Sequence, residues 1–234
     1  GINFNIYYLL LIRKWKNALK SSELCFYAGM VAVAVIAICI NIYPIYGNLS
    51  DALRHSAFQV ATVVSTTGYA TADFNLWPGF SKTILLVLMF IGACAGSTAG
   101  GFKCSRVIIL LKKTRRETKR LLHPRSVNTV RFEGKTVENQ LINSVSSYLT
   151  VYILIYCIVT LIISLDGFDI ETNISAATAC FNNIGPGLSA VGPTANYASF
   201  SPVSKLVLSM AMLLGRLEIY PVLITLSPST WVKK

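Results

Sequence analysis

The sequence predicts an all-α membrane protein. Of its 234 residues, 53% are hydrophobic and only 13% are charged. Four stretches carry no charged residue at all, at positions 24–46, 83–102, 146–165 and 206–215. Uncharged stretches of about 20 residues match the thickness of the hydrocarbon core of a bilayer. A soluble protein can bury one such segment as a central helix, but four of them favour embedding in a membrane.

The cysteines and histidines predict no metal site. The six cysteines fall mostly inside the apolar stretches and form no close CxxC pair, at Cys25, Cys39, Cys94, Cys104, Cys157 and Cys180. They are therefore interpreted as small hydrophobic residues of packed helices rather than as metal ligands or a disulfide framework. His55 and His123 stand alone and form no ligand set.

The distribution of basic residues predicts the orientation in the membrane. Basic residues gather before the first apolar stretch, after the second and at the end of the chain, as Arg13, Lys14, Lys16, Lys20, the cluster from Lys103 to Lys135, Lys233 and Lys234. Only Arg54 and Lys82 lie between the first and second stretches, and only Lys205 between the third and fourth. By the positive-inside rule, the N-terminus, residues 103–145 and the C-terminus are cytoplasmic.

The net charge of +11 therefore reflects topology and does not favour binding of nucleic acid. The basic segment 112–135 has two open interpretations, which are ordinary charge beside lipid headgroups and a docking surface for a cytoplasmic partner.

An internal repeat predicts the order of the elements. Residues 57–70 align with 174–187, and residues 80–92 align with 203–215, so that Gly68 falls on Gly185. Each unit reads as a spanning helix, a shorter amphipathic helix, a glycine-containing polar segment and another spanning helix. Residues 49–66 and 168–183 are too short and too polar to span, so they are predicted to be re-entrant helices that enter from outside.

The polar segment "STTGYATADF", residues 65–74, has a physical explanation in this arrangement. Non-helical backbone at membrane depth is tolerated where it is buried in protein or lines a watery cavity. Along a cavity, its carbonyls can replace the hydration shell of a cation. Glycine adopts backbone angles that point carbonyls at the axis, and the C-terminal end of each short helix favours a cation. The alternative is a glycine-rich outer loop that binds no ion.

Four motifs carry a family resemblance. They are "VSTTGYATADF", "FIGACAGSTAGGFKCSRV", "FNNIGPGLSAVGP" and "LLGRLEIYPVL". With them the sequence resembles the Trk/Ktr/HKT superfamily of potassium transporters, most closely the Trk-type bacterial membrane subunit. The resemblance implies potassium uptake across the bacterial plasma (inner) membrane, with potassium as the substrate and no other cofactor.

Members of this superfamily carry four helix–pore helix–helix repeats, and this chain shows the third and fourth. It is therefore expected to be the C-terminal half of a longer transporter or the product of a truncated gene. The expected divisions are 1–23 (the end of a preceding repeat, with "GINF" closing its last helix, and a linker), 24–113 (a repeat), 114–145 (a cytoplasmic linker) and 146–234 (a repeat).

The resemblance also implies the residues of a potassium-selective filter. These are Thr66, Thr67, Gly68 and Tyr69 in the third repeat, and Asn183, Ile184, Gly185, Pro186 and Gly187 in the fourth. The fourth segment has Asn183 in place of the usual threonine, and the third ends in Ala70. A strictly four-fold filter geometry is therefore not expected.

A break in the second apolar stretch is expected at "GACAGSTAGG", residues 92–101, because four glycines make a poor helix interior. The resemblance implies that this break is a gate, an intramembrane loop beneath the filter formed by Gly92, Ala93, Ala95, Gly96, Ser97, Thr98, Gly100 and Gly101, together with Arg216. The alternative is close helix packing through small residues.

Arg216 follows the last apolar stretch, and an arginine inside the membrane is costly unless it faces a cavity or a partner. Glu218 is only two residues away and would not face it on a helix. Arg216 is therefore expected to point into the pore, and the alternative is an arginine that reaches to the headgroups.

Acidic residues are expected on the outer side, where they either concentrate cations or are simply solvated, at Asp51, Asp73, Asp166, Asp169 and Glu171. An intramembrane enzyme is disfavoured, because no nucleophile–base pair, metal set or pair of acids lies at membrane depth.

The expected partners are membrane lipid, the remaining repeats, a second copy in a homodimer and a cytoplasmic nucleotide-binding regulatory subunit. Conduction is expected to be channel-like or coupled to sodium or protons. A less selective potassium/sodium pathway and a purely structural membrane subunit remain alternatives, although the second leaves both glycine segments unexplained.

Overall fold

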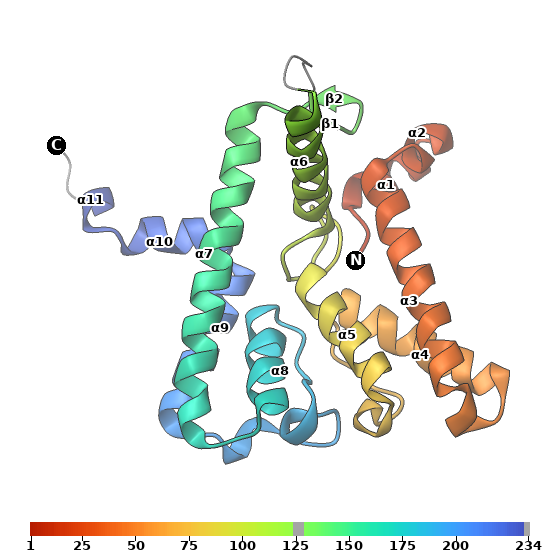
Figure 1. The fold of residues 1–234 in the computed structure, drawn as a ribbon, viewed down its shortest axis with the longest axis vertical. Helices are drawn as coiled ribbons and strands as arrows, with labels where there is room; N and C mark the ends of the chain where they lie inside the picture. Colours follow the sequence, from red (N-terminus) through yellow and green to blue (C-terminus); the bar gives the residue numbers. More distant parts are fainter. Residues whose placement is uncertain (124–128, 232–234) are drawn as a thin grey trace.

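The computed structural model describes residues 1–123 and 129–231. They form two groups of helices, with a long helix and a small hairpin between them in the chain (Figure 1). The first group contains α1 (Phe4–Leu11), α2 (Trp15–Leu19), α3 (Ser22–Tyr46), α4 (Leu49–Val64), η1 (Phe74–Leu76) and α5 (Gly79–Ile91). The second group contains α7 (Asn139–Ile163), η2 (Ser164–Asp166), α8 (Ile170–Phe181), η3 (Ser189–Val191), η4 (Tyr197–Ser199), α9 (Pro202–Arg216), α10 (Ile219–Leu226) and α11 (Pro228–Trp231). The predicted all-α class is confirmed.

Two helices of the described residues, α3 and α7 with η2, are long and apolar enough to cross a membrane by length and composition. A third candidate is the bent pair formed by α9 and α10. Helix α5 is apolar but has only 13 residues, which correspond to about 20 Å of helix. It therefore ends well short of the ~30 Å of a hydrocarbon core.

Helices α4 and α8 each start with a side-chain cap, as the local sequence favours. The Asn48 side chain accepts a hydrogen bond from the Ser50 N–H at the start of α4, and the Asp169 side chain accepts one from the Thr172 N–H at the start of α8. The two helices occupy nearly the ranges predicted for re-entrant helices. Figure 1 shows α4 and α8 in the lower half of the molecule, with α4 crossing α3 and α8 beside α7.

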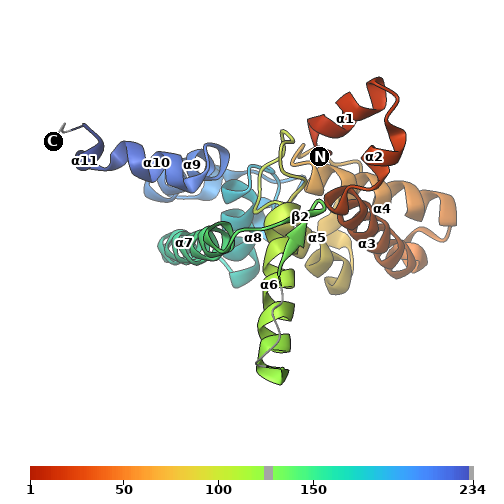
Figure 2. The same ribbon diagram turned by 90° about the horizontal axis from the view of Figure 1, so that it is seen from above.

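The second apolar stretch is interrupted, as the sequence predicts. Helix α5 ends at Ile91, residues 92–103 are non-helical, and α6 (Cys104–Leu122) follows. We call residues 92–103 the gate loop, after the role predicted for residues 92–101. Figure 1 shows it near mid-height of α3 and α7, and Figure 2 shows α6 extending out to one side of both groups.

The last apolar stretch differs from the predicted spanning helix. Helix α9 ends at Arg216, and the axis turns by 109° before the next helix. Glu218 has a φ of +61°, outside the helical region. Pro221 explains why the helix does not continue, because proline has no N–H to donate to the carbonyl of Leu217 and its ring would clash there.

The segment that joins the two groups carries a small antiparallel hairpin of β1 (Arg131–Phe132) and β2 (Lys135–Thr136). Glu133 and Gly134 form its two-residue turn, and both have positive φ, at 49° and 75°. This combination is typical of a type I′ turn. Residues 124–128 of the predicted basic segment, and the terminal Lys233 and Lys234, lie outside the described residues.

The first residues of the chain lead into α1, which starts at Phe4. That "GINF" closes the last helix of a preceding repeat stays a prediction. The Asn3 side chain caps α1 by accepting a hydrogen bond from the Asn5 N–H, which is the role that asparagine favours. Gly1 and Phe4 bond instead to the gate loop, through Cys94 N–H to the Gly1 oxygen (3.0 Å) and Phe4 N–H to the Gly96 oxygen (3.1 Å).

Each group has its own apolar core. Residues of α3, α4 and α5 form the first, around Ile38, Val60 and Leu85, and residues of α7, α8 and α9 form the second, around Tyr152, Phe181 and Leu208. Ile184 and Leu188, from the second group, belong to the first core. The two groups are therefore packed together at the segments that follow α4 and α8.

Candidate functional site

The predicted filter segments begin with the same cap on two different helices. After α4, Thr66 N–H bonds to the Val63 oxygen (3.2 Å) and Thr67 N–H to the Thr62 oxygen (2.9 Å). After α8, Asn183 N–H bonds to the Cys180 oxygen (3.1 Å) and Ile184 N–H to the Ala179 oxygen (2.8 Å). This is the pair of bonds of a Schellman motif, repeated at aligned positions.

The two caps place residues other than glycine in left-handed backbone. Thr66 has a φ of 55° and Asn183 a φ of 56°, at the position where helices usually carry glycine. For a β-branched threonine this conformation is an outlier that costs of order 1–3 kcal/mol. Such strain persists only where surrounding contacts impose it, and it concentrates at functional sites.

The glycines let the two segments touch. A Cβ built on Gly68 would lie only 2.2 Å from the Ile184 carbonyl oxygen, and one built on Gly185 would lie 4.0 Å from the Gly68 Cα. Both have positive φ, at 82° and 113°, so a side chain would be strained as well as crowded. Residues more than 110 positions apart thus meet through main-chain atoms.

The remaining predicted filter residues lie around this contact in different ways. Pro186 comes near Gly68, since its Cδ would be 3.4 Å from the same Cβ. Tyr69 is exposed, and Gly187 turns back onto α8, where a Cβ would lie 3.0 Å from the Ser175 Oγ. Gly187 therefore serves close packing rather than the contact between the segments.

One side chain that the sequence reasoning missed binds a carbonyl of a predicted filter segment. The Tyr197 hydroxyl donates a hydrogen bond to the Gly185 oxygen at 2.8 Å. Tyr197 lies in η4, between the second predicted filter segment and α9, where a tyrosine gives no sequence signal of this contact. The bond holds the Gly185–Pro186 peptide plane in one orientation.

The gate loop is closed by main-chain hydrogen bonds at its neck. Phe102 N–H bonds to the Phe90 oxygen (3.2 Å), Lys103 N–H to the Ile91 oxygen (2.9 Å) and Cys104 N–H to the Ala93 oxygen (2.9 Å). The Ser97 hydroxyl also donates to the Cys94 oxygen at 2.6 Å. These bonds satisfy part of the polar backbone that a break in an apolar helix exposes.

Through Gly100 the gate loop contacts one predicted filter segment, at Thr66, and the C-cap residue of α8, Asn182, which precedes the other. Gly100 N–H donates to the Thr66 Oγ1 at 3.2 Å, and a Cβ on Gly100 would lie 2.2 Å from the Asn182 oxygen. Glycine at this position therefore permits an approach that no other residue allows. The loop lies directly against the two caps that begin the filter segments.

Arg216 is hydrogen-bonded to the gate loop. Its Nη1 donates to the Thr98 main-chain oxygen at 2.6 Å, from the last residue of α9. Gly215 lets α9 approach, because a Cβ there would lie 1.8 Å from the Phe181 oxygen at the end of α8. The Thr98 carbonyl is therefore a hydrogen-bond partner for a guanidinium that stays charged.

Glu218 pairs with cations that the sequence reasoning did not connect to it. Lys103 Nζ lies 2.8 Å from its Oε1, and Arg106 Nη2 lies 3.1 Å from its Oε2. Arg106 also stacks over the Tyr148 ring, with 3.9 Å from its Cζ to the ring centroid. The turn after α9 is thereby tied to the end of the gate loop and the start of α6.

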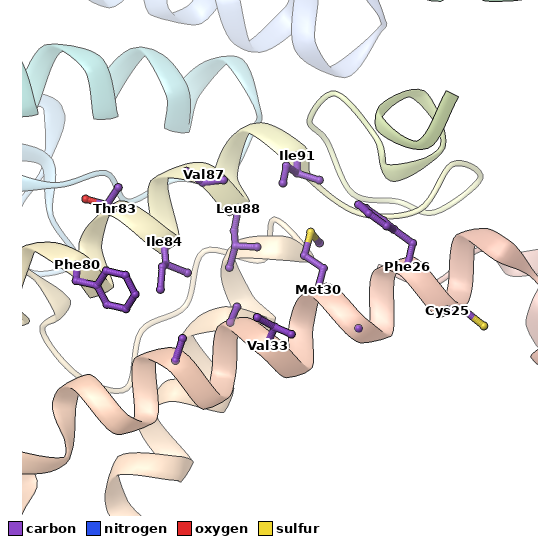
Figure 3. Close-up of a pocket in the computed structure, with 13 residues that line it drawn as sticks. Cys25, Phe26, Met30, Val33, Phe80, Thr83, Ile84, Val87, Leu88 and Ile91 are labelled. Atoms are coloured by element: carbon purple, nitrogen blue, oxygen red, sulfur yellow. The ribbon is translucent and has the colours of Figure 1, made fainter. Parts of the chain in front are cut away.

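A small polar cavity of about 120 Å³ lies at this junction. It is lined by Arg216 and Glu218, Lys103, Tyr148 and gate-loop residues 97–101. A larger cavity of about 560 Å³ lies elsewhere, between α3 and α5 (Figure 3). Its lining, which includes Met30, Val33 and Leu88, is almost entirely apolar, so it offers a cation no ligands.

The predicted outer acids take local structural contacts. Asp73 caps η1 by accepting from the Asn75 N–H, and Glu171 forms an ion pair with Lys82 at 2.7 Å. Asn75 joins the two groups, because its side chain exchanges two hydrogen bonds with the Ser189 backbone, at 3.0 Å and 2.9 Å. The two interpretations of these acids, which either concentrate cations or are simply solvated, stay predictions.

Comparisons with known proteins identify the family of this chain. The Trk system potassium uptake protein TrkH of Salmonella typhimurium is 33% identical over 235 aligned residues, which cover 99% of this chain and 48% of the relative. The potassium uptake protein TrkG of Escherichia coli is 34% identical, with the same coverage. The chain thus spans about half the length of these curated relatives.

A solved structure gives the same result. The crystal structure of the potassium transporter TrkH from Vibrio parahaemolyticus matches with a TM-score of 0.88 and 31% sequence identity, over 99% of this chain and 50% of that one. The family model described as TrkH, cation transport protein, matches residues 28–233. The predicted resemblance is confirmed, and the family is one of transporters rather than enzymes. The chain belongs to the TrkH family of cation transport proteins.

Proposed function

We propose that this chain forms part of a potassium uptake pathway across the bacterial inner membrane. The observation that supports this proposal most strongly is the main-chain contact between Gly68 and Ile184, which brings together two aligned segments from separate groups of helices. Both follow a short helix whose C-terminal end has a partial negative charge, which favours a cation. Main-chain oxygens of 66–69 and 183–187 are the proposed ligands of potassium.

Two segments supply only part of a ring of ligands, so the pathway is completed by the repeats that make up the rest of the transporter. The orientation follows from charge, with the hairpin, α6 and both ends of the chain on the cytoplasmic side. A homodimer and a cytoplasmic nucleotide-binding regulator, docked at the basic part of α6, are the further proposed partners.

Uptake of radioactive rubidium into proteoliposomes tests the proposal directly. With the assembled transporter, unlabelled potassium should suppress rubidium uptake at much lower concentration than sodium does. Equal suppression by both ions would favour the less selective pathway, which the presence of Asn183 and Ala70 in the filter segments makes the second candidate. Absence of any transporter-dependent uptake would contradict the proposal.

The gate loop is proposed to close this pathway below the filter, held shut by Arg216. The guanidinium places a fixed positive charge next to the route of the cation and binds the Thr98 oxygen. A hydrogen bond to a charged group contributes about 1.5–3 kcal/mol, which corresponds to roughly tenfold or more in an equilibrium constant.

Replacing Arg216 with glutamine should raise rubidium flux in the absence of a regulator by about tenfold, because it removes the charge and weakens the bond to the loop. The preference for potassium over sodium should stay, since the filter is untouched. Arg216→Lys keeps the charge and should keep most of the block. Flux equal to the parent in a membrane-inserted Arg216→Gln variant would instead indicate an arginine that anchors the helix at the headgroups.

A further inference from the structure

Glu23 is a buried carboxylate that contacts the gate loop. Only 5% of it is exposed, although it lies in the first turn of α3. Its Oε1 accepts two main-chain hydrogen bonds, from Ala95 N–H at 2.7 Å and from Ser105 N–H at 3.1 Å. Ala95 belongs to the first half of the gate loop and Ser105 to the first turn of α6. One oxygen atom of α3 thus joins the loop to the helix that follows it.

The two hydrogen bonds to Glu23 are strong because their acceptor is a carboxylate. A buried carboxylate is costly unless hydrogen bonds compensate for the lost water, and bonds to a charged acceptor are about twice as strong as neutral ones. The first turn of α6 also lacks a cap of its own, because Lys103 at the N-cap position makes no side-chain cap bond. Glu23 supplies the missing acceptor from another helix, at the positive end of the α6 dipole.

The position of Glu23 is fixed in turn by the hairpin between the two groups. The Glu133 Oε1 accepts hydrogen bonds from the Ser21 hydroxyl and from the Glu23 N–H, both at 3.0 Å. Glu133 sits in the two-residue turn with positive φ, which costs energy for a residue other than glycine or asparagine. Two carboxylates in series therefore connect the hairpin to the start of α3, and the start of α3 to the gate loop.

We propose that Glu23 is a positioning residue of the gate loop, and that the hairpin turn at Glu133 sets its position from the cytoplasmic side. Glu23 holds the loop against the start of α6, so that Gly100 and Thr98 lie where they meet Thr66 and Arg216. The inference rests on the proposed function, because it assumes that the loop closes the pathway. It adds that the closed position depends on α3 and on the hairpin.

Glu23→Gln is the central test, in the assembled transporter without a regulator. The amide keeps the size of the side chain but loses the charge that strengthens both bonds. Rubidium uptake per inserted protein should rise roughly tenfold, with the potassium-to-sodium preference unchanged. Glu133→Gln should raise it less, by about two- to threefold, because it acts only through the start of α3. Glu138→Gln, an exposed glutamate that makes no cap bond to α7, is the matched control and should leave uptake as in the parent.

A double variant distinguishes the positioning role of Glu23 at the gate loop from a general role in the stability of the protein. In a variant whose gate loop is shortened by deletion of residues 97–99, Glu23→Gln should not raise rubidium uptake further, because the loop that Glu23 positions is already displaced. Independent effects that multiply in the double variant would contradict the inference. If Glu23→Gln yields too little inserted protein, Glu133→Gln takes its place, compared once with the parent and once in the shortened-loop variant. Unchanged uptake in Glu133→Gln would overturn the connection to the hairpin.

The result also separates the inference from the proposed function. Unchanged uptake in inserted Glu23→Gln, together with raised uptake in the shortened loop, would reject the role of Glu23 and keep the gate. Unchanged uptake in both would reject the gate itself.

Discussion

Replacing Gly68 with alanine or aspartate is expected to abolish potassium uptake. A Cβ at this position would lie 2.2 Å from the Ile184 oxygen, which is main chain and has little freedom to move. The new side chain would force apart the two segments that form the proposed filter. The backbone angle adds to the cost, because a φ of +82° is unfavourable for a residue with a side chain. Growth of a potassium-uptake-deficient bacterium at low potassium, together with rubidium uptake, measures the result.

Gly47 provides the matched control for this substitution. It also has a positive φ, of 64°, but no atom lies within 4 Å of a Cβ built on it. Gly47→Ala and Gly47→Asp therefore carry a similar backbone cost of about 1–2 kcal/mol without the clash. Uptake near that of the parent is expected from both. Uptake that survives in a Gly68→Asp variant inserted at normal levels would be incompatible with a filter at this position.

Shortening the gate loop by residues 97–99 should raise ion flux in the absence of a regulator by an order of magnitude or more. The deletion removes the Thr98 oxygen that Arg216 binds and withdraws Gly100 from Thr66, while the hydrogen bonds at the neck of the loop remain. The loss of two such contacts, at about 1–3 kcal/mol each, shifts a closed loop strongly toward open. Rubidium flux into proteoliposomes, normalised to inserted protein, measures the change.

Adding Gly68→Asp to the shortened loop serves as the control for this result. Flux through the proposed filter should disappear in the double variant, whereas leakage around a damaged protein would persist. A correctly inserted deletion with the flux of the parent would instead support the alternative in which the small residues of 92–101 only pack helices together.

The sequence predicts the local elements of the site well, because they depend on short-range patterns. The ranges of α4 and α8 follow from amphipathic segments that are too short and too polar to span and that end at glycine-containing motifs. The gate loop follows from four glycines within ten residues, which no helix interior favours. The family resemblance placed Arg216 near this loop, and the structure has its side chain on the Thr98 oxygen.

Contacts between distant side chains were beyond prediction. Glu218 was considered only as a partner of Arg216, two positions away, whereas it pairs with Lys103 and Arg106 from more than 110 residues earlier. Glu23 gave no signal, since an acid in the first turn of a helix is ordinary dipole complementarity. The 109° turn after α9 was also missed, although Pro221 marks where the helix cannot continue.

Anomalous diffraction from thallium, a potassium substitute, in crystals of the assembled transporter tests the central claim most directly. We predict a thallium peak on the conduction axis, within coordination distance of main-chain oxygens from both 66–69 and 183–187. The peak should disappear in Gly68→Asp and persist in Gly47→Asp. Thallium bound only at outer acids such as Asp73, with none between the two glycine segments, would contradict the account.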